Sequence, residues 1–373
     1  MKKNVIKYFL ISMLISCQGG DSESDPNSLN PTDSSDNIEN ENEWLIPLGL
    51  VADGGPGQDG VPSIDNPKFI DRTYTINGSL LDDDDLVIGI AKGNDVRAYP
   101  HYILDWHEIV NDFIDGQVVA ISYCPLTGTA FGWSGDSNGS RRSTFGTTGL
   151  LYKANLILYD RNTNSNWSQL RLDCVNGSLI GSKPILTRIV ETNWKTWKAL
   201  YPNTKVLSTD TGFSRNYTRY PYGSYKTDHD FFIFRAFPSN SNLPNKERVY
   251  AIIDGDNSKV YRYENFENGK VIKDEFEGKE ILVVGNENLI YSFQMNNSNS
   301  HLDFEYDFKE NNPDSGTDNT NVFFKDNEGN KWTIFGEAID GPRTGEKLMA
   351  TKSVVSYWFA IAAFYPNPKI YSE

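Results

Sequence analysis

The feature that most constrains the fold of this chain is an internal repeat. Trp194 and the segment Tyr201-Pro202-Asn203 recur as Trp358 and Tyr365-Pro366-Asn367, in both cases 164 residues further on. Upstream, a fainter match at a spacing of 162 residues pairs Tyr99, Asp112 and Gly116 with Tyr261, Asp274 and Gly278. Self-similarity at a fixed spacing indicates that one structural module is used twice.

The residue pattern within each copy predicts short strands. Leu86 to Ala91 and Val96 to Tyr99 are predicted strands on either side of a Gly93-Asn94 turn. Thr192 to Leu200 has helical spacing and should end before Pro202. We therefore predict an α+β fold, mostly antiparallel β-sheet with a few short helices, in two tandem copies of one module. The predicted first module covers residues 44–212, a connector covers 213–244, and a second, degenerate copy covers 245–373.

The N-terminus is predicted to direct export. Basic Lys2 and Lys3 precede an apolar run, Tyr8 to Ser16, that is too short to span a bilayer. This run ends at Leu14-Ile15-Ser16-Cys17, which resembles the lipobox of bacterial lipoproteins; an ordinary signal peptide with a chance cysteine is the alternative. Residues 1–17 are thus predicted to be a lipoprotein signal segment that ends at a lipidated Cys17, followed by a disordered acidic tether over residues 18–43.

These features predict a membrane partner and a location in the cell envelope. A lipid on Cys17 would be the anchor, and we expect the outer membrane, on its periplasmic or surface face. The net charge of −15, with no basic stretch longer than Arg141-Arg142, argues against nucleic acid as a partner.

A predicted hairpin carries the most informative residue, Cys124. Alternating runs from Ile109 to Tyr123 flank Asp115-Gly116, which is a strong two-residue turn signal. Counting outward from that turn along two continuous strands places His107 opposite Cys124, with Cβ atoms about 5 Å apart. A protonated imidazole beside a thiol lowers the pKa of the thiol, so Cys124 is a candidate nucleophile and His107 its candidate base. A disulfide between Cys124 and Cys174 is the structural alternative.

The second copy serves as an internal comparison for this pair. At the spacing of 162 residues, the positions of His101, Trp106, His107 and Cys124 are taken by Tyr263, Asn268, Gly269 and Asn286. The scaffold itself therefore does not require Cys or His at these positions. The first copy is predicted to be the working module.

The same two residues are candidate metal ligands. Thiolate and imidazole from Cys124 and His107, together with His101 or His229, would suit copper or zinc. The stretch from His107 to Asn111 departs from the H-E-x-x-H zinc motif, because its last residue is Asn and the segment is predicted to be a strand.

Several motifs together resemble the DUF3179 family. They are Tyr99-Pro100, Ile103 to Asp112, Tyr123 to Ala130, Phe145 to Tyr152, Leu158 to Arg161 and Trp167 to Gln169. The resemblance covers most of the chain after the tether, and it implies an exported or envelope protein without implying a reaction. Many members carry a second Cys at the position of Thr127, whereas Thr127 here removes the Cys-x-x-Cys dithiol expected of a general oxidoreductase.

The family-like segments supply the remaining candidate binding residues. They are Tyr99, His101, Trp106, Asn111, Thr127, Gly128, Thr129, Asp160, Arg161 and Gln169. Two hypotheses of function follow. In the first, Cys124 and His107 form a thiol-dependent site in which the amides of Gly128 and Thr129 stabilise an anion. In the second, the chain is a non-catalytic binding lipoprotein that recognises a glycan, a peptide or a protein partner. The residues leave open whether the ligand of the site is a small molecule, a glycan or a protein.

Overall fold

The computed structural model describes residues 43–71, 81–135, 143–310 and 321–372. The predicted signal segment (residues 1–17) with Cys17, and all of the predicted tether (18–43) except Glu43, lie outside the described residues. No helix in the described part of the chain is long and apolar enough to cross a membrane.

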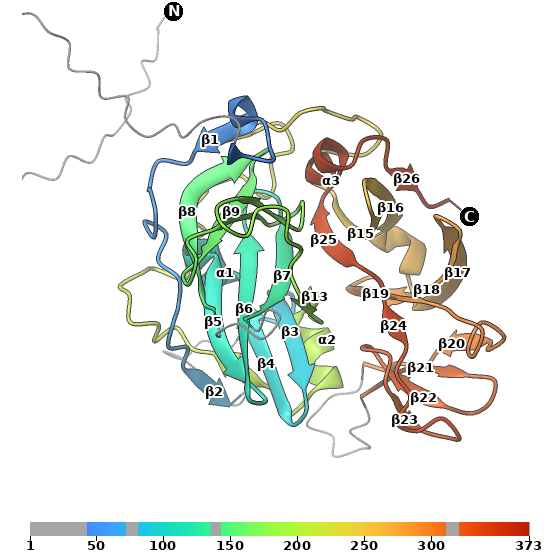
Figure 1. Cartoon of the computed structure of the whole chain (residues 1–373). Coiled ribbons are helices and arrows are strands. Elements are labelled where there is room, and N and C mark those ends of the chain that lie inside the picture. Colours follow the sequence, from blue (N-terminus) through green and yellow to red (C-terminus); the bar gives the residue numbers. More distant parts are fainter. Residues whose placement is uncertain (1–42, 72–80, 136–142, 311–320, 373) are drawn as a thin grey trace, which may run out of the picture. The chain divides into compact units, whose positions relative to one another are not determined.

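The described residues of the first half form three sheets (Figure 1). One has the strand order β13 (Val190–Asn193), β3 (Leu86–Lys92), β4 (Asp95–Pro100), β14 (Lys205–Leu207) and β2 (Phe69–Asp71). The next has the order β12 (Leu186–Thr187), β7 (Thr129–Ser134), β6 (Gln117–Cys124) and β5 (Ile109–Ile114). The third has the order β1 (Val51–Asp53), β8 (Phe145–Tyr152), β9 (Asn155–Asp160), β10 (Asn166–Ser168) and β11 (Asp173–Asn176).

In the second half, the strands that the structure describes also form three sheets. Their strand orders are β25 (Ser353–Tyr357), β15 (Arg248–Asp254), β16 (Asn257–Arg262) and β26 (Lys369–Ile370); then β17 (Lys270–Phe276), β18 (Lys279–Asn286), β19 (Leu289–Gln294) and β24 (Met349–Ala350); and last β20 (Phe304–Tyr306), β21 (Val322–Asp326), β22 (Lys331–Thr333) and β23 (Ala338–Asp340).

The predicted α+β class, mostly antiparallel, is confirmed. Strand β14 pairs in parallel with β4, and β26 pairs in parallel with β16, while the other pairs of named strands are antiparallel. The α-helices of the described residues are short: α1 (His101–His107), α2 (Trp194–Leu200) and α3 (Trp358–Phe364). The described residues also include the 3₁₀ turns η2 (Leu48–Leu50) and η3 (Tyr263–Phe266).

Local chemistry explains the elements that the sequence predicted best. Asp115 and Gly116 both have positive φ, 46° and 77°, as a two-residue hairpin turn of the right twist requires. Helix α2 begins where the side chain of Asn193 accepts a hydrogen bond from the amide of Thr196, and it ends before Pro202. Its buried face, which includes Trp194 and Trp197, packs into the core.

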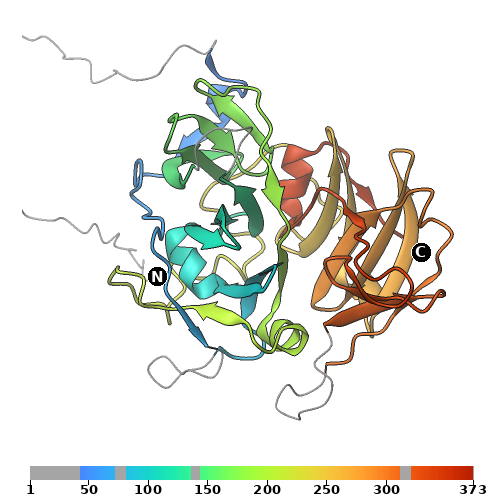
Figure 2. The same ribbon diagram turned by 60° about the horizontal axis from the view of Figure 1, so that its bottom comes forward.

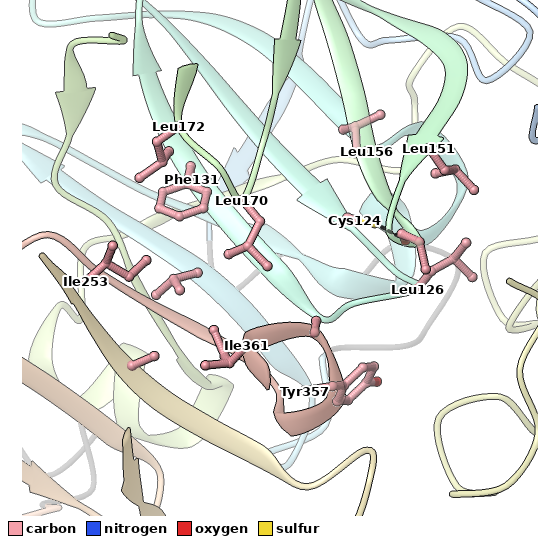
Figure 3. Packing of buried hydrophobic residues seen from close by; sticks show 14 of the residues in the cluster. Cys124, Leu126, Phe131, Leu151, Leu156, Leu170, Leu172, Ile253, Tyr357 and Ile361 are labelled. Atoms are coloured by element: carbon pink, nitrogen blue, oxygen red, sulfur yellow. Dashed lines mark hydrogen bonds between the residues drawn. The ribbon is translucent and has the colours of Figure 1, made fainter. Parts of the chain in front are cut away.

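The two halves share a hydrophobic core. Figures 1 and 2 show the strands of the first half, blue to green, beside those of the second half, orange to red. One cluster joins Phe131 and Leu170 of the first half to Ile253 and Ile361 of the second, as Figure 3 shows. Burying large apolar side chains against one another is the main term that stabilises such an arrangement. Residues Asn40 to Glu373 accordingly form one compact unit.

Candidate functional site

The hairpin that carries Cys124 has the predicted register, but His107 does not extend it. Ile109 pairs with Ser122 and Ile114 with Gln117, as counted from the turn. His107 is instead the last residue of α1, and Glu108, with φ 56°, turns the chain between the helix and β5.

His107 and Cys124 consequently have separate partners. Nδ1 of His107 lies 2.8 Å from the carbonyl oxygen of Pro62, and Nε2 lies 2.7 Å from the hydroxyl of Tyr217. The sulfur of Cys124 faces the carbonyl oxygen of Ala154 at 3.8 Å. Because both ring nitrogens of His107 are occupied, the predicted hydrogen bond between the imidazole and the thiol is not formed.

Cys124 lies in apolar surroundings. It is 1 % exposed, and its neighbours in Figure 3 include Leu126 and Leu156. Burial, with a smaller effect from Glu108, raises the pKa of this thiol to about 11. The expected lowering of the thiol pKa is therefore wrong in direction. The alternative disulfide is also absent, since Cys124 and Cys174 are both free and buried.

The turn after Cys124 is held by a buried hydrogen-bond network. The Nδ2 of Asn155 donates to the hydroxyls of Thr127 and Thr129, both at 2.9 Å, and to Oε1 of Gln169 at 2.8 Å. Thr129 donates to the same Gln169 oxygen at 2.6 Å. The amide of Gly128 donates to the carbonyl oxygen of Cys124 at 2.9 Å, so it is not available to an anion, contrary to the prediction. Thr127, Thr129 and Gln169 stabilise the turn.

Three other predicted residues, Tyr99, Trp106 and Asn111, also have partners within the protein. The hydroxyl of Tyr99 donates to Asp112 at 2.6 Å, and the indole of Trp106 donates to the carbonyl of Arg219 at 3.2 Å. Asn111 donates to Asp65 at 2.7 Å and to the carbonyl of Phe145 at 2.8 Å.

Asp160 and Arg161 follow the same pattern. Asp160 accepts from the hydroxyl of Thr163 at 2.7 Å and from the indole of Trp167 at 3.2 Å. The guanidinium of Arg161 forms an ion pair with Asp65 at 2.8 Å. Both residues therefore fix the path of the chain around β9.

The predicted metal ligands do not converge. Among the described residues, no group of three or more His, Cys, Asp or Glu side chains is arranged to hold a metal ion. Nδ1 of His229 accepts a hydrogen bond from the amide of Lys246 at 3.1 Å, which directs it elsewhere. The described residues thus offer no donor set for the copper or zinc that the sequence suggested.

His101 differs from the other predicted residues because no described residue forms a hydrogen bond with its ring nitrogens. The side chain is buried, and neither ring nitrogen has a hydrogen-bond partner. Its Nε2 lies 3.8 Å from Oε2 of Glu191, which is too far for a direct hydrogen bond. Its ring lies 4.3 Å from that of Tyr123 between centroids. Burial, together with the positive charges of Lys226 and Arg248, lowers the pKa of His101, so the imidazole is neutral.

His101 belongs to a set of buried or half-buried polar side chains that we call the polar cluster. It draws residues from α1 and β6, from β13, from the connector and from the second half: His101, Asp105, Glu108, Tyr123, Glu191, Tyr220, Tyr222, Lys226, Arg248, Tyr263 and Tyr357. Two ion pairs cross it. Lys226 donates to Asp105 at 2.8 Å, and Arg248 donates to Glu191.

The polar cluster concentrates the unsatisfied polar atoms of the protein. Of eleven buried side-chain nitrogen and oxygen atoms without a hydrogen-bond partner among the described residues, six lie here. They are both ring nitrogens of His101, Oδ1 of Asp105, Oε2 of Glu191 and the hydroxyls of Tyr220 and Tyr263. Because buried polar atoms in proteins nearly always have a partner, water or a ligand must supply the missing ones.

Burial also raises the pKa values of the carboxyl groups in the polar cluster. It raises the pKa of Glu108 to about 7, and it raises the pKa of Asp105 to about 6 against the opposing charge of Lys226. The pKa of Glu191 is raised by burial and lowered in part by Arg248. Carboxyl groups that titrate near neutral pH and lie together are typical of functional sites.

Sequence reasoning identified His101 but missed most of the polar cluster. Asp105 and Glu108 lie inside the family-like segment Ile103 to Asp112, so that segment was the available signal. The pair of Glu191 and Arg248 had no local signal, because it joins two strands from different halves of the chain.

The fold and the site thus define an α+β protein of mostly antiparallel sheets. Its polar cluster is buried between the two halves and the connector. Over residues 58–368 the chain matches the model of a family described as "Protein of unknown function (DUF3179)". Since the match covers most of the chain, the protein belongs to the DUF3179 family, and the resemblance seen in its motifs is confirmed. No curated protein and no solved structure matches the chain.

Proposed function

We propose that this DUF3179 protein is an envelope lipoprotein that binds a small polar ligand at the polar cluster. The observation that carries the proposal is the convergence of six buried polar atoms without partners. Leaving a buried polar group unpaired costs about 1–3 kcal/mol. A protein retains several such groups in one place most readily where a bound molecule completes them.

We further propose that the two halves are copies of one module, in which the first copy carries most of the site. Support comes from the strand order β13-β3-β4-β14, which recurs as β25-β15-β16-β26, and from β12-β7-β6-β5, which recurs as β24-β19-β18-β17. The bond from Tyr99 to Asp112, 2.6 Å, recurs from Tyr261 to Asp274, 2.8 Å. In this proposal the second copy lends Arg248, Tyr263 and Tyr357.

The proposed role is binding rather than thiol chemistry. A thiol whose pKa is raised to about 11 is protonated at neutral pH, and the thiolate is the nucleophilic form. Cys124 contributes to packing in this proposal, as its place in the shared hydrophobic core indicates. Cys124→Ser separates the two hypotheses, because ligand binding survives it under the binding hypothesis and fails under the thiol hypothesis.

The membrane anchor is proposed from the sequence of the N-terminus, with Cys17 as the lipidated residue. Expressed in a bacterium with lipoprotein processing, the full chain is expected to incorporate labelled palmitate and to fractionate with the outer membrane. Cys17→Ser is expected to abolish the label, whereas Cys174→Ser, the matched control, keeps it. Labelling that persists in Cys17→Ser would contradict the anchor.

The binding proposal is tested at His101 by nuclear magnetic resonance. The full chain, labelled with ¹⁵N-histidine, contains four His residues. Ethylammonium, glucose and acetate are added separately as probes of different charge. At least one probe is expected to shift the ring nitrogens of His101, assigned by His101→Asn, because they have no partner in the protein. The ring of His107, with both nitrogens already bonded, is the internal control and should not move.

Two outcomes would reject binding at the polar cluster. One is that none of the three probes moves the His101 resonances. The other is that His101 and His107 shift in parallel, which indicates a general effect of the added solute. A selective shift at His101 supports the proposal whichever probe causes it.

A further inference from the structure

We propose that the ligand of the polar cluster is a small organic ammonium cation, held by the carboxylate of Glu108 and the ring of Tyr222. This inference rests on the proposed function and names the chemical class of its ligand. It also assigns a role to Glu108, whose charge no other part of the described structure uses.

The charges of the polar cluster leave Glu108 without a counter-ion. Asp105 has Lys226 at 2.8 Å, and Glu191 has Arg248. Among the described residues, no cation and no hydrogen-bond donor reaches the carboxyl of Glu108, which belongs to a residue 9 % exposed. His101 is neutral and adds no positive charge. With its acids ionised, the cluster therefore has one negative charge in excess, and a buried charge without a partner is costly.

The backbone at Glu108 indicates that its side chain is retained for its chemistry. Its φ of 56° lies in the left-handed region, and its carbonyl accepts from the amide of Tyr123 at 2.7 Å. This conformation costs a residue with a β-carbon about 1 kcal/mol, and glycine would adopt it without that cost. A strained residue that also buries an unpaired carboxylate is typical of a functional position.

The tyrosine whose side chain is influenced by the carboxyl of Glu108 is Tyr222. The charge of Glu108, acting on Tyr222 and on Cys124, raises the pKa of both groups beyond the effect of burial. The ring of Tyr123 lies instead against that of His101, at 4.3 Å between centroids. The faces of tyrosine rings attract cations, and carboxylates beside such rings bind ammonium groups.

The protein already places its own ammonium groups against tyrosine rings, and in one case beside a carboxylate as well. Nζ of Lys226 donates to Asp105 at 2.8 Å and lies 4.2 Å from the centre of the Tyr220 ring. Nζ of Lys246 lies 3.6 Å from the centre of the Tyr225 ring and donates to the carbonyl of Tyr225 at 2.7 Å. A carboxylate and a tyrosine ring thus hold the ammonium group of Lys226 at Asp105, close to Glu108 on the chain. Glu108 and Tyr222 form a similar pair of carboxylate and ring, but no ammonium group of the described residues lies between them.

Other ligand classes fit less well. An anion would face the excess negative charge. A neutral polyol would satisfy the unpaired atoms but would leave the carboxylate of Glu108 uncompensated. A metal ion needs several converging ligands, and the described residues contain no such group.

The test is calorimetric titration of the full chain in detergent with ethylammonium chloride, at a pH above 7 where Glu108 is ionised. We expect saturable binding that Glu108→Gln weakens by about tenfold or more. The matched control is Glu305→Gln, which removes a carboxylate of a residue whose side chain is 74 % exposed and should leave the affinity unchanged. Tyr222→Leu should weaken binding, whereas Tyr222→Phe keeps the ring and most of the affinity; this pair decides the matter if Glu108→Gln fails to fold.

The outcomes separate this inference from the proposed function. The inference is overturned if ethylammonium does not bind, if Glu108→Gln and Glu305→Gln bind it equally well, or if zinc chloride binds through Glu108 in its place. If glucose or acetate then shifts the His101 resonances selectively, the proposed function stands and only the inference of an ammonium ligand is lost. If no probe binds or shifts His101, both proposals fail.

Discussion

Replacing Arg248 by methionine is expected to lower the free energy of unfolding by about 3–5 kcal/mol. Arg248 on β15 is the cation that pairs with Glu191 on β13, and Glu191 is 5 % exposed. Methionine retains apolar length but leaves the carboxylate buried without its counter-charge. The carboxyl can avoid part of this cost by binding a proton, so the loss should be larger at pH 8 than at pH 5. Urea unfolding at the two pH values measures it.

Two variants establish that the loss comes from the buried charge. Lys68→Met breaks an ion pair with Asp210 in which both side chains are well exposed, and it should cost less than about 1 kcal/mol. The double variant Glu191→Gln with Arg248→Met removes both charges and should regain a large part of the stability. Equal losses in Lys68→Met and Arg248→Met would show that burial does not govern the pair.

The parts of the fold that depend on neighbouring residues could be predicted from the sequence. Asp115-Gly116 specified the turn. That turn then determined the pairing register of β5 and β6, from Ile114 and Gln117 outward. The spacing of Trp194 and Trp197 specified the buried face of α2. In each case the signal and the structure it specifies lie within about ten residues, so few competing arrangements exist.

The predicted pair of His107 and Cys124 failed at a single residue. The prediction extended β5 beyond Ile109 as a strand, whereas Glu108 adopts a left-handed conformation and α1 ends at His107. Glutamate has no special preference for that conformation, so the sequence contained no warning of the turn. The hairpin could be predicted, whereas the conformation of Glu108, which leads from α1 into the hairpin, could not.

The polar cluster could not be predicted because it is assembled from distant segments. Glu191 and Arg248 meet only when β13 and β15 are placed, and Lys226 and Tyr222 come from a connector without strands. Position 127 shows the same limit in another form. In the sequence, Thr127 was read only as the absence of a second cysteine. In the structure its hydroxyl forms hydrogen bonds with Thr129 and Asn155.

Glu108→Gln is expected to change how stability depends on pH. Burial raises the pKa of Glu108 from 4.5 to about 7, while the unfolded chain keeps the ordinary value. Between these pH values the folded protein holds a proton that the unfolded chain has released, so the free energy of unfolding falls as pH rises. A shift of this size corresponds to about 3 kcal/mol, which is present below about pH 4.5 and lost above about pH 7. Glutamine cannot titrate, so the variant should lack this part of the decline.

Urea unfolding of both proteins across that pH range measures the difference directly. Relative to the native chain, Glu108→Gln should gain stability steadily from pH 4.5 to pH 7 and no further above it. Asp105 titrates in both proteins and therefore cancels from the comparison. Parallel profiles for the native chain and Glu108→Gln would mean that the buried carboxyl of Glu108 is already compensated, and the case for a cation beside it would be lost.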